Sequence, residues 1–493
     1  MTTPIWTNSE WTFPLLTKVY DECEKIAKDE LHLNIYPNQI EIISAEQMLD
    51  AYSSVGMPVF YRHWSFGKHF VKEQQNYQSG RSGLAYELVI NSSPCINYLM
   101  EDNSMTMQAL VIAHAAFGHN HFFKNNYLFR QWTDADSIID YLVFAKDYII
   151  KQEEKHGRDV VEKWIDSCHA LMSYGVNRYK RPTKISMAKE KVRQRERLDY
   201  IQSQVSELYR LLPPGKNEQK IVEDKKIPKQ PEENLLYFFE KYSPDIEEWQ
   251  REILRIIRKI SVYFYPQGQT KVMNEGFASM THYTILNRLH DKGLMTDGAM
   301  LEFLHSHSGV LYQPSYDSKR YSGLNPYAFG FAMLRDIQRM CKNPTAEDLR
   351  WFPKVKGANA QELILESVED FRDESFIRQW LSPAVIRELH LFNVHDDRAD
   401  KEKYLVTAIH NDKGYEIIKE NLANQYLDMT MVPSLEVINV DRKTRALTIQ
   451  YTENKGRKLG NVDKVFPHIE KLWGGYPIIL VDDKGNTIKK STS

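Results

Sequence analysis

The chain has 493 residues, of which 42% are hydrophobic and 26% are charged, and its formal net charge is −2. These values are typical of a globular protein with two or three domains and argue against intrinsic disorder. A net charge near zero supplies no field that would recruit nucleic acid or an anionic membrane. Four cysteines without a CxxC pair indicate reduced thiols, and they support neither a disulfide framework nor a thiolate zinc site. The N-terminus lacks a signal sequence and no window is apolar enough to span a membrane, so we expect a cytoplasmic protein.

Helical periodicity dominates the first 380 residues, for example at 11–31 and 136–150, whereas strand-like alternation is scarce there. A basic run at 181–197 is typical of a solvated helix, and nucleic-acid binding is therefore the third-ranked function. Residues 213–233 are rich in Lys, Glu, Gln and Pro, which predicts an exposed charged loop inside the first domain.

The character of the sequence changes after residue 380. Five segments have strand composition, and two have helical patterns. We therefore predict an α+β fold, with a large, mainly α-helical domain at 1–380 followed by a small α/β C-terminal domain at 385–488. The expected strands are 389–394, 404–409, 435–440, 446–451 and 477–481, and the expected helices are 415–425 and 462–473.

Three histidines lie within eight residues, His114, His119 and His121, on a helix expected to start near Asn103 and Ser104. In a straight α-helix His119 is rotated from His114 by about 140°, and His121 is aligned with His114 but lies about 10 Å further along. Gly118 permits a bulge that would swing His119 towards His114. The alternative is a satisfied core histidine followed by two helix-terminal caps.

Glu275 is flanked by apolar residues on two sides of a predicted helix. A buried ionised carboxylate costs several kcal/mol unless it is paired or bound to a metal, so Glu275 needs a partner. The alternative is a salt bridge to an arginine or a carboxylate favoured by the helix dipole. His282 follows seven residues later along the same line and is a candidate for orienting a ligand or binding substrate.

Two further residues are candidates for supporting roles. His169 follows Asp166 by three residues on one helical face, the spacing of a carboxylate and imidazole in metal-binding bundles, although ordinary helix pairing explains it equally well. Residues 304–309 read as a loop, and Tyr327 sits in a turn that enters a helix. Its hydroxyl is a candidate hydrogen-bond donor to an oxyanion, although a buried tyrosine with a satisfied hydroxyl is the commoner finding.

These motifs resemble a known family. The run His-Ala-Ala-Phe-Gly-His-Asn-His-Phe-Phe at 114–123, with Asn-Glu-Gly-Phe-Ala at 274–278 and Asn-Pro-Tyr at 325–327, resembles the SpoVR family, named for stage V sporulation protein R. The resemblance covers nearly the whole chain. It implies a cytoplasmic bacterial protein linked in spore formers to sporulation and spore cortex formation, but it implies no particular reaction.

A second likeness concerns mechanism. The histidine-rich helix break and the downstream Glu-containing helix are similar to zincin-type metallopeptidases, in which two histidines on one helix and a glutamate on another bind zinc. In those enzymes a glutamate after the first histidine is the general base, whereas this chain has Ala115. A hydrolase would therefore need another base, for which Glu87 and His282 are the candidates.

Two hypotheses follow. The first is a SpoVR-like, metal-dependent hydrolase that cleaves an amide or peptide bond in a protein or a cell-wall precursor. The second is a non-catalytic regulatory or partner-binding protein with a degenerate metallopeptidase-like core, which the absence of a glutamate at position 115 favours. For the first, the expected metal is zinc, with His114, His119 and Glu275 as ligands, His121 as the alternative ligand, His282 and Tyr327 as catalytic residues, and His169 and Asn274 in the second shell.

Overall fold

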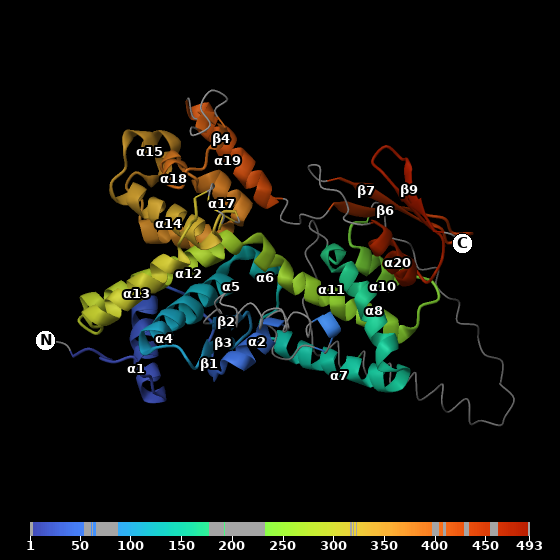
Figure 1. The fold of residues 1–493 in the computed structure, drawn as a ribbon, viewed down its shortest axis with the longest axis horizontal. Coiled ribbons are helices and arrows are strands. Elements are labelled where there is room, and N and C mark those ends of the chain that lie inside the picture. The colour runs from blue at the N-terminus through green and yellow to red at the C-terminus, as the bar shows by residue number, and fades with distance from the viewer. Residues whose placement is uncertain are drawn as a thin grey trace. The chain divides into compact units, whose positions relative to one another are not determined.

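In the part of the chain that the structure describes, the fold is mostly helical, with three small sheets (Figure 1). We describe it from a computed structural model. Most of the basic run at 181–197 and of the loop at 213–233 lies outside the described residues, so both predictions stay untested. The structure describes residues 3–53, 61, 63–65, 87–176, 192, 232–315, 318, 320–321, 323–396, 404–407, 411–427, 433–453 and 462–491.

The chain forms two compact units that each draw on several stretches of sequence. Unit 1 contains residues 1–58, 64–135 and 264–430, and unit 2 contains residues 59–63, 136–263 and 431–493. The expected division into domains at 1–380 and 385–488 stays a prediction about where independently folding parts begin and end.

Unit 1 holds the longest run of helices and two small sheets. Its first part contains α1 (Phe13–Lys25), η1 (Ile26–Glu30), β1 (Asn38–Ile43), α2 (Ala45–Ser53), β2 (Glu87–Ile90), β3 (Cys95–Met100), α4 (Met105–Val111), η2 (Ile112–His119), α5 (Asn120–Asn125) and α6 (Tyr127–Trp132). Its second part contains α12 (Lys271–Asp291), α13 (Asp297–Val310), α14 (Pro326–Lys342), α15 (Ala346–Trp351), η4 (Pro353–Val355), α16 (Ala360–Asp370), α17 (Asp373–Trp380), α18 (Pro383–Glu388), β4 (Asn393–Asp396), β5 (Tyr404–Thr407) and α19 (Asp412–Leu427).

Unit 2 combines helices with a four-stranded sheet in the order β6-β7-β8-β9. Strands β6 and β7 are antiparallel, β7 and β8 are parallel, and β8 and β9 are antiparallel. Its elements are α7 (Ile138–His156), α8 (Arg158–Ala170), η3 (Met172–Tyr174), α10 (Leu235–Tyr242), most of α11 (Glu248–Gln269), β6 (Ser434–Val440), β7 (Leu447–Thr452), α20 (Val462–Leu472), β8 (Ile478–Val481) and β9 (Thr487–Lys490).

The helices begin where side chains can accept hydrogen bonds from exposed amides. Ser104 accepts from the Met107 amide at the start of α4, and Asn325 accepts from the Tyr327 amide at the start of α14. Both starts agree with the sequence prediction. The expected loop at 304–309 was wrong, because Thr296 caps a helix, α13, that continues to Val310.

A sheet near the N-terminus is the main element that the periodicity missed. Its order is β1-β3-β2, with β1 parallel and β2 antiparallel to β3. The strands have only four to six residues, so their alternation is hard to separate from a helical pattern in sequence. This sheet matters for the site because β2 begins at Glu87.

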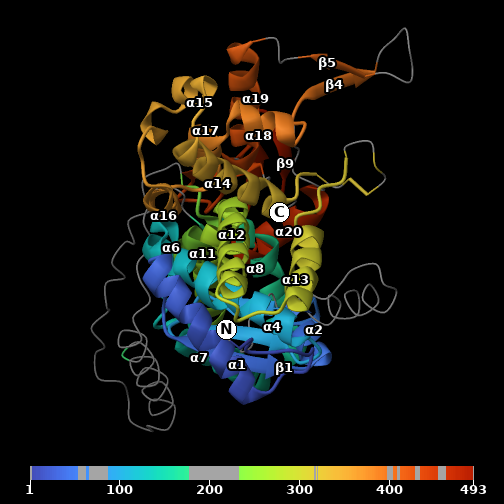
Figure 2. The same ribbon diagram turned by 90° about the vertical axis from the view of Figure 1, so that its left-hand side faces the viewer.

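Helix α12 packs closely against η2 and α14 in unit 1. Figure 2 shows α12 and α14. The backbones approach so tightly that a Cβ on Gly276 would lie 2.4 Å from the carbonyl carbon of Gly330. A Cβ on Gly118 would lie 2.6 Å from the Cα of Ala278. Small residues at these crossings therefore bring η2 and the first half of α12 together, and with them the histidines and Glu275.

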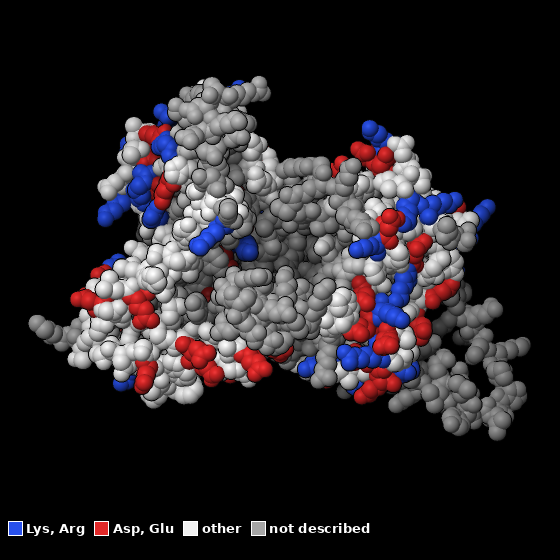
Figure 3. Space-filling model, viewed as in Figure 1, with Lys and Arg blue, Asp and Glu red and all other residues white. Residues whose placement is uncertain are grey.

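Surface charge is mixed on the face shown in Figure 3, where Lys and Arg alternate with Asp and Glu around α7, α8 and α20. This matches the formal net charge of −2. Within the described ranges, no helix combines the length and apolar character that crossing a bilayer requires.

Candidate metal centre

The helix that carries His114 and His119 changes its winding at this point. Residues Ile112–His119 form a π-helical segment, η2, and the Asn120 amide after it donates to the Ala115 carbonyl five residues back. With this i→i+5 pattern, residues five apart stand above one another, as residues about four apart do in an α-helix. The bulge inferred from Gly118 is present, and it extends over eight residues. His114 and His119 consequently face the same point, with their ring centroids 4.6 Å apart.

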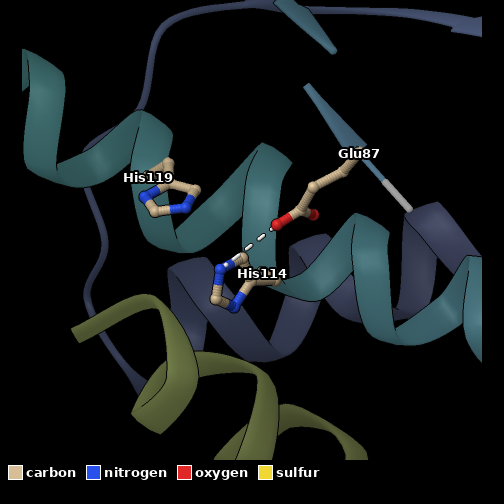
Figure 4. A group of neighbouring side chains, drawn as sticks. All are labelled: Glu87, His114 and His119. Atoms are coloured by element: carbon tan, nitrogen blue, oxygen red, sulfur yellow. Dashed lines mark ion pairs between the residues drawn. The ribbon is translucent and has the colours of Figure 1, made fainter. Parts of the chain in front are cut away.

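Two carboxylates from other elements meet these imidazoles. Glu87 Oε1, from β2, lies 3.2 Å from His114 Nε2 (Figure 4). Glu275 Oε2, from α12, lies 3.8 Å from His114 Nε2 and 3.5 Å from His119 Nε2. One ligand atom from each of Glu87, His114 and His119 can be chosen so that all three lie within 4.8 Å of one another. We call Glu87, His114, His119 and Glu275 the four-residue cluster.

The spacing of these atoms suits a small cation. Zinc–nitrogen and zinc–oxygen bonds of about 2.1 Å give a tetrahedron whose edges are about 3.4 Å. The nitrogen–oxygen distances of 3.2, 3.5 and 3.8 Å bracket that edge length. Imidazole and carboxylate are also common ligands for zinc and related divalent metals. The cluster therefore has the donors and the size for one divalent ion.

The surroundings shift the pKa values of the two carboxylates in opposite directions. Burial raises the pKa of Glu87 to about 7, although the neighbouring His114 opposes the shift. Burial would also raise the pKa of Glu275, but His114, His119 and the Tyr327 hydroxyl outweigh it and lower that pKa below its usual value. Glu275 is therefore ionised at neutral pH, whereas Glu87 exchanges a proton near pH 7.

The two histidines differ in the same way. Burial alone would lower the pKa of His114, but Glu87 and Glu275 outweigh burial and raise it. Burial lowers the pKa of His119 to about 4, against the attraction of Glu275. His119 is thus neutral and ready to bind a metal at pH 7, whereas the raised pKa of His114 means that protons compete with a metal for its ring up to a higher pH.

A surrounding layer of polar contacts fixes the cluster. Asn274 Oδ1 lies 2.9 Å from His119 Nδ1, which leaves Nε2 directed at Glu275. Asp373 accepts hydrogen bonds from the amides of Val272 and Met273, both at 2.9 Å, and so holds the start of α12. Tyr327 hydrogen-bonds to Glu275. The structure thus places the expected second-shell Asn274 beside His119.

His282 lies next to the cluster but is fully engaged. Its Nδ1 is 2.8 Å from His114 Nδ1, and its Nε2 is 2.7 Å from His307 Nδ1. Because both ring nitrogens already have a ring partner, His282 has no nitrogen left to take a proton from water. Its place supports a role in orienting His114.

Two sequence candidates are not brought into the four-residue cluster. The Nδ1 of His121 accepts the Asn34 amide at 2.9 Å, and its ring packs 5.3 Å from that of Phe277. His169 lies in unit 2, where its Nε2 contacts the Tyr61 hydroxyl and its ring packs 4.6 Å from His63. Each ring has local partners of its own.

Two contributors were missed or given another role. Glu87 was considered only as a base, because no periodicity tied a short strand at 87–90 to the histidine helix. His307 was expected in a loop. The signal that could have placed it on a helix is its spacing of seven residues from Met300, which puts the two residues on one face of a capped helix.

Comparisons with known proteins agree with the motifs. Residues 10–431 match the family described as SpoVR like protein, and residues 433–484 match the SpoVR-like C-terminal domain. The chain is 54% identical over 476 residues to a protein of Escherichia coli (strain K12) named Uncharacterized protein YcgB, a match that covers 96% of this chain and 93% of that protein. No solved structure gives a significant match. Because the two family models match residues 10–431 and 433–484, this protein belongs to the SpoVR family.

Proposed function

We propose that this protein is a metal-dependent hydrolase that binds one divalent ion, zinc by preference, through His114, His119 and Glu275 and cleaves an amide bond. The observation that carries the proposal is the convergence of Glu87, His114, His119 and Glu275, with nitrogen–oxygen distances of 3.2 to 3.8 Å between elements far apart in sequence. Three protein ligands with one open position are the usual arrangement of a catalytic zinc site.

Geometry supports the remaining role. A divalent ion in this position would supply Lewis acidity and activate water. Glu87 Oε1, which lies 3.2 Å from His114 Nε2, is close enough to take the proton from the attacking water and pass it to the leaving nitrogen. The side chains of Glu87 and Glu275 keep 20% and 17% of their surface exposed, whereas the Oε2 atoms of both carboxylates are buried. Glu87 thus serves as the general base. In the zincin pattern a glutamate has this role, and this chain has Ala115 at that position.

The second candidate is a non-catalytic protein with a closed metal site. The observation in its favour is that Glu87 Oε1 lies 3.2 Å from His114 Nε2, close enough to become a fourth ligand. Four protein ligands are typical of a structural zinc site, and such a site leaves no position for water. The α/β tail would then carry the function by binding a partner.

The first experiment measures metal content. Purified wild type should contain about one equivalent of zinc or iron by elemental analysis, and Glu275→Gln should lose most of it while staying folded by circular dichroism. Glu369→Gln, which changes an exposed glutamate of α16, is the matched control and should keep its metal. Wild type that binds no divalent ion after reconstitution would contradict the proposal.

The second experiment separates the two functions. Glu87→Gln should keep its metal but lose hydrolysis of a mixed pool of short peptides, with products detected by mass spectrometry. If Glu87→Gln instead loses metal as Glu275→Gln does, and wild type cleaves nothing, the closed structural site is correct.

The wider role follows from family resemblance and is proposed with less detail. A peptide or cell-wall precursor as substrate, a part in sporulation and cortex formation, a zincin-like fold and a cytoplasmic location all stay predictions. The name of the SpoVR family supports the part in sporulation, and the paired histidines and glutamate support the zincin-like fold.

A further inference from the structure

A pocket in unit 1 is bordered by His307 of α13. It has a volume of about 830 Å³ and is lined by residues of α12, α13 and α14 and of the segment after α13. This is within the size range of sites for small organic ligands. Its apolar wall includes Met280, Tyr283, Leu311, Tyr312 and Phe331.

His307 connects this pocket to the four-residue cluster. It lines the pocket and lies 2.7 Å through Nδ1 from His282 Nε2, and His282 Nδ1 lies 2.8 Å from His114 Nδ1. The centroids of successive rings are 5.0 and 4.9 Å apart. Three imidazoles in a hydrogen-bonded row therefore join the cluster to the pocket.

Metal ligation by His114 would fix the direction of every hydrogen bond in this row, a step that rests on the proposed function. An imidazole that binds a metal through Nε2 carries its proton on Nδ1, so His114 donates to His282 Nδ1. A neutral imidazole has one proton, so a ring that accepts at one nitrogen donates from the other. His282 must then donate from Nε2 to His307 Nδ1, and His307 carries its proton on Nε2.

That outer N–H has no hydrogen-bond acceptor among the described residues, and His307 borders the pocket. Arg288 and Arg335 also line the pocket, with side chains 53% exposed. Arg335 pairs with Glu388, and Arg288 pairs with Glu30 and, at 3.9 Å, with Asp291, which also lines the pocket. A guanidinium has five N–H donors, so each arginine keeps some for a further acceptor. The pocket thus offers donors beside aromatic walls.

We propose that this pocket binds a small organic carboxylate, which accepts a hydrogen bond from His307 and is coupled through His282 to the metal ion on His114. A carboxylate that accepts from His307 strengthens each donor along the row and makes the His114 ring a better ligand. Zinc and the carboxylate therefore bind more tightly together than alone, and the effect is equal in both directions.

Benzoate is the probe, because it joins a carboxylate to an aromatic ring. Titration calorimetry on the full chain should give a benzoate Kd at least about five-fold lower in zinc-loaded than in metal-free protein, and zinc competition with a chelator should show the same factor. Arg335→Gln should weaken benzoate binding several-fold. Arg350→Gln, which changes an ion-paired surface arginine outside the pocket, should leave it unchanged.

The coupling has its own test. In His282→Phe, zinc and benzoate should each still bind, but neither should change the affinity for the other. If that variant does not fold, ¹⁵N NMR of histidine-labelled wild type replaces it, and zinc alone should place the His307 proton on Nε2.

Zinc binding without benzoate binding would overturn the pocket proposal and leave the metal centre standing. A benzoate affinity that is the same with and without zinc would overturn the coupling. Binding of inorganic phosphate in place of benzoate would overturn the carboxylate assignment. Failure to bind zinc at all would overturn the metal centre and the coupling together.

Discussion

At the scale of single residues, chemically similar groups of the four-residue cluster have pKa values that are shifted in opposite directions. His114 and His119 are both buried imidazoles, yet neighbouring carboxylates raise the pKa of one while burial lowers the pKa of the other to about 4. Glu87 and Glu275 diverge in the same way. A pair of titratable groups with pKa values driven apart by their surroundings is typical of a site that moves protons.

The first prediction concerns pH. Protons compete with zinc for His114, whose pKa is raised, and zinc binding benefits from an ionised Glu87, whose pKa is about 7. Affinity should therefore fall as pH is lowered from 8 to 6, by at least about ten-fold. Chelator competition at each pH, corrected for the chelator's own protonation, measures this. An affinity independent of pH over this range would contradict the assignment of His114 as a ligand.

The second prediction concerns Asn274. Its side-chain oxygen lies 2.9 Å from His119 Nδ1 and sets the orientation of the ring, so Asn274→Ala should weaken zinc binding by about 10- to 100-fold. Asn287→Ala, on the same helix and away from the cluster, should leave zinc affinity unchanged. Equal zinc affinities in the two variants would mean that packing alone orients His119.

At this scale the sequence indicated which side chains to compare with the structure. Glu275 was expected to need a partner, and the structure places it beside His114 and His119. The sequence did not separate His121 from His119, because the π-helical winding decides which of the two faces His114. It also did not pair Glu87 with His114, because that contact joins a strand and a helix with no pattern linking them.

At the scale of elements, the close approach of η2, α12 and α14 brings the residues of the site together. In the sequence, Gly118 was the one indication of the π-helical segment and of the glycine contacts. The need for Gly276 and Gly330 at the α12–α14 crossing could not be predicted, because it depends on tertiary packing. The strands of the C-terminal sheet were mostly anticipated from composition, since β6, β7 and β8 lie within one residue of the expected ranges. Strand β9 was missed, because its Thr-Ile-Lys-Lys sequence is short and exposed.

The third prediction tests that approach. A Cβ on Gly276 would lie 2.4 Å from the Gly330 backbone, so Gly276→Ala should force α12 and α14 apart and lower the free energy of unfolding by about 1–3 kcal/mol or more. Gly298→Ala, in α13, meets nothing within 4 Å and should be neutral or stabilising by up to about 1 kcal/mol. Urea unfolding followed by circular dichroism compares them. Equal stability of the two variants would mean that the crossing relaxes easily.

At the scale of the whole molecule, the chain folds into two compact units, and the four-residue cluster lies in one of them. Glu87, His114, His119 and Glu275 all belong to unit 1, although they come from stretches separated by the long insertion that contributes to unit 2. Metal binding should therefore stabilise unit 1 directly. Any effect on unit 2 would require energetic coupling between the units.

The fourth prediction uses this difference. A ligand that binds only the folded state stabilises it by about 2.7 kcal/mol when present at 100 times its Kd. Hydrogen exchange with zinc and with a chelator should therefore show slower exchange in η2 and α12 of the zinc-loaded protein, while α8 and α20 exchange at the same rate in both. Glu275→Gln should show no zinc effect in either unit. Slowing confined to α8 and α20 would place the metal in unit 2, at the histidine contacts of His63 and His169, and would contradict the centre proposed in unit 1.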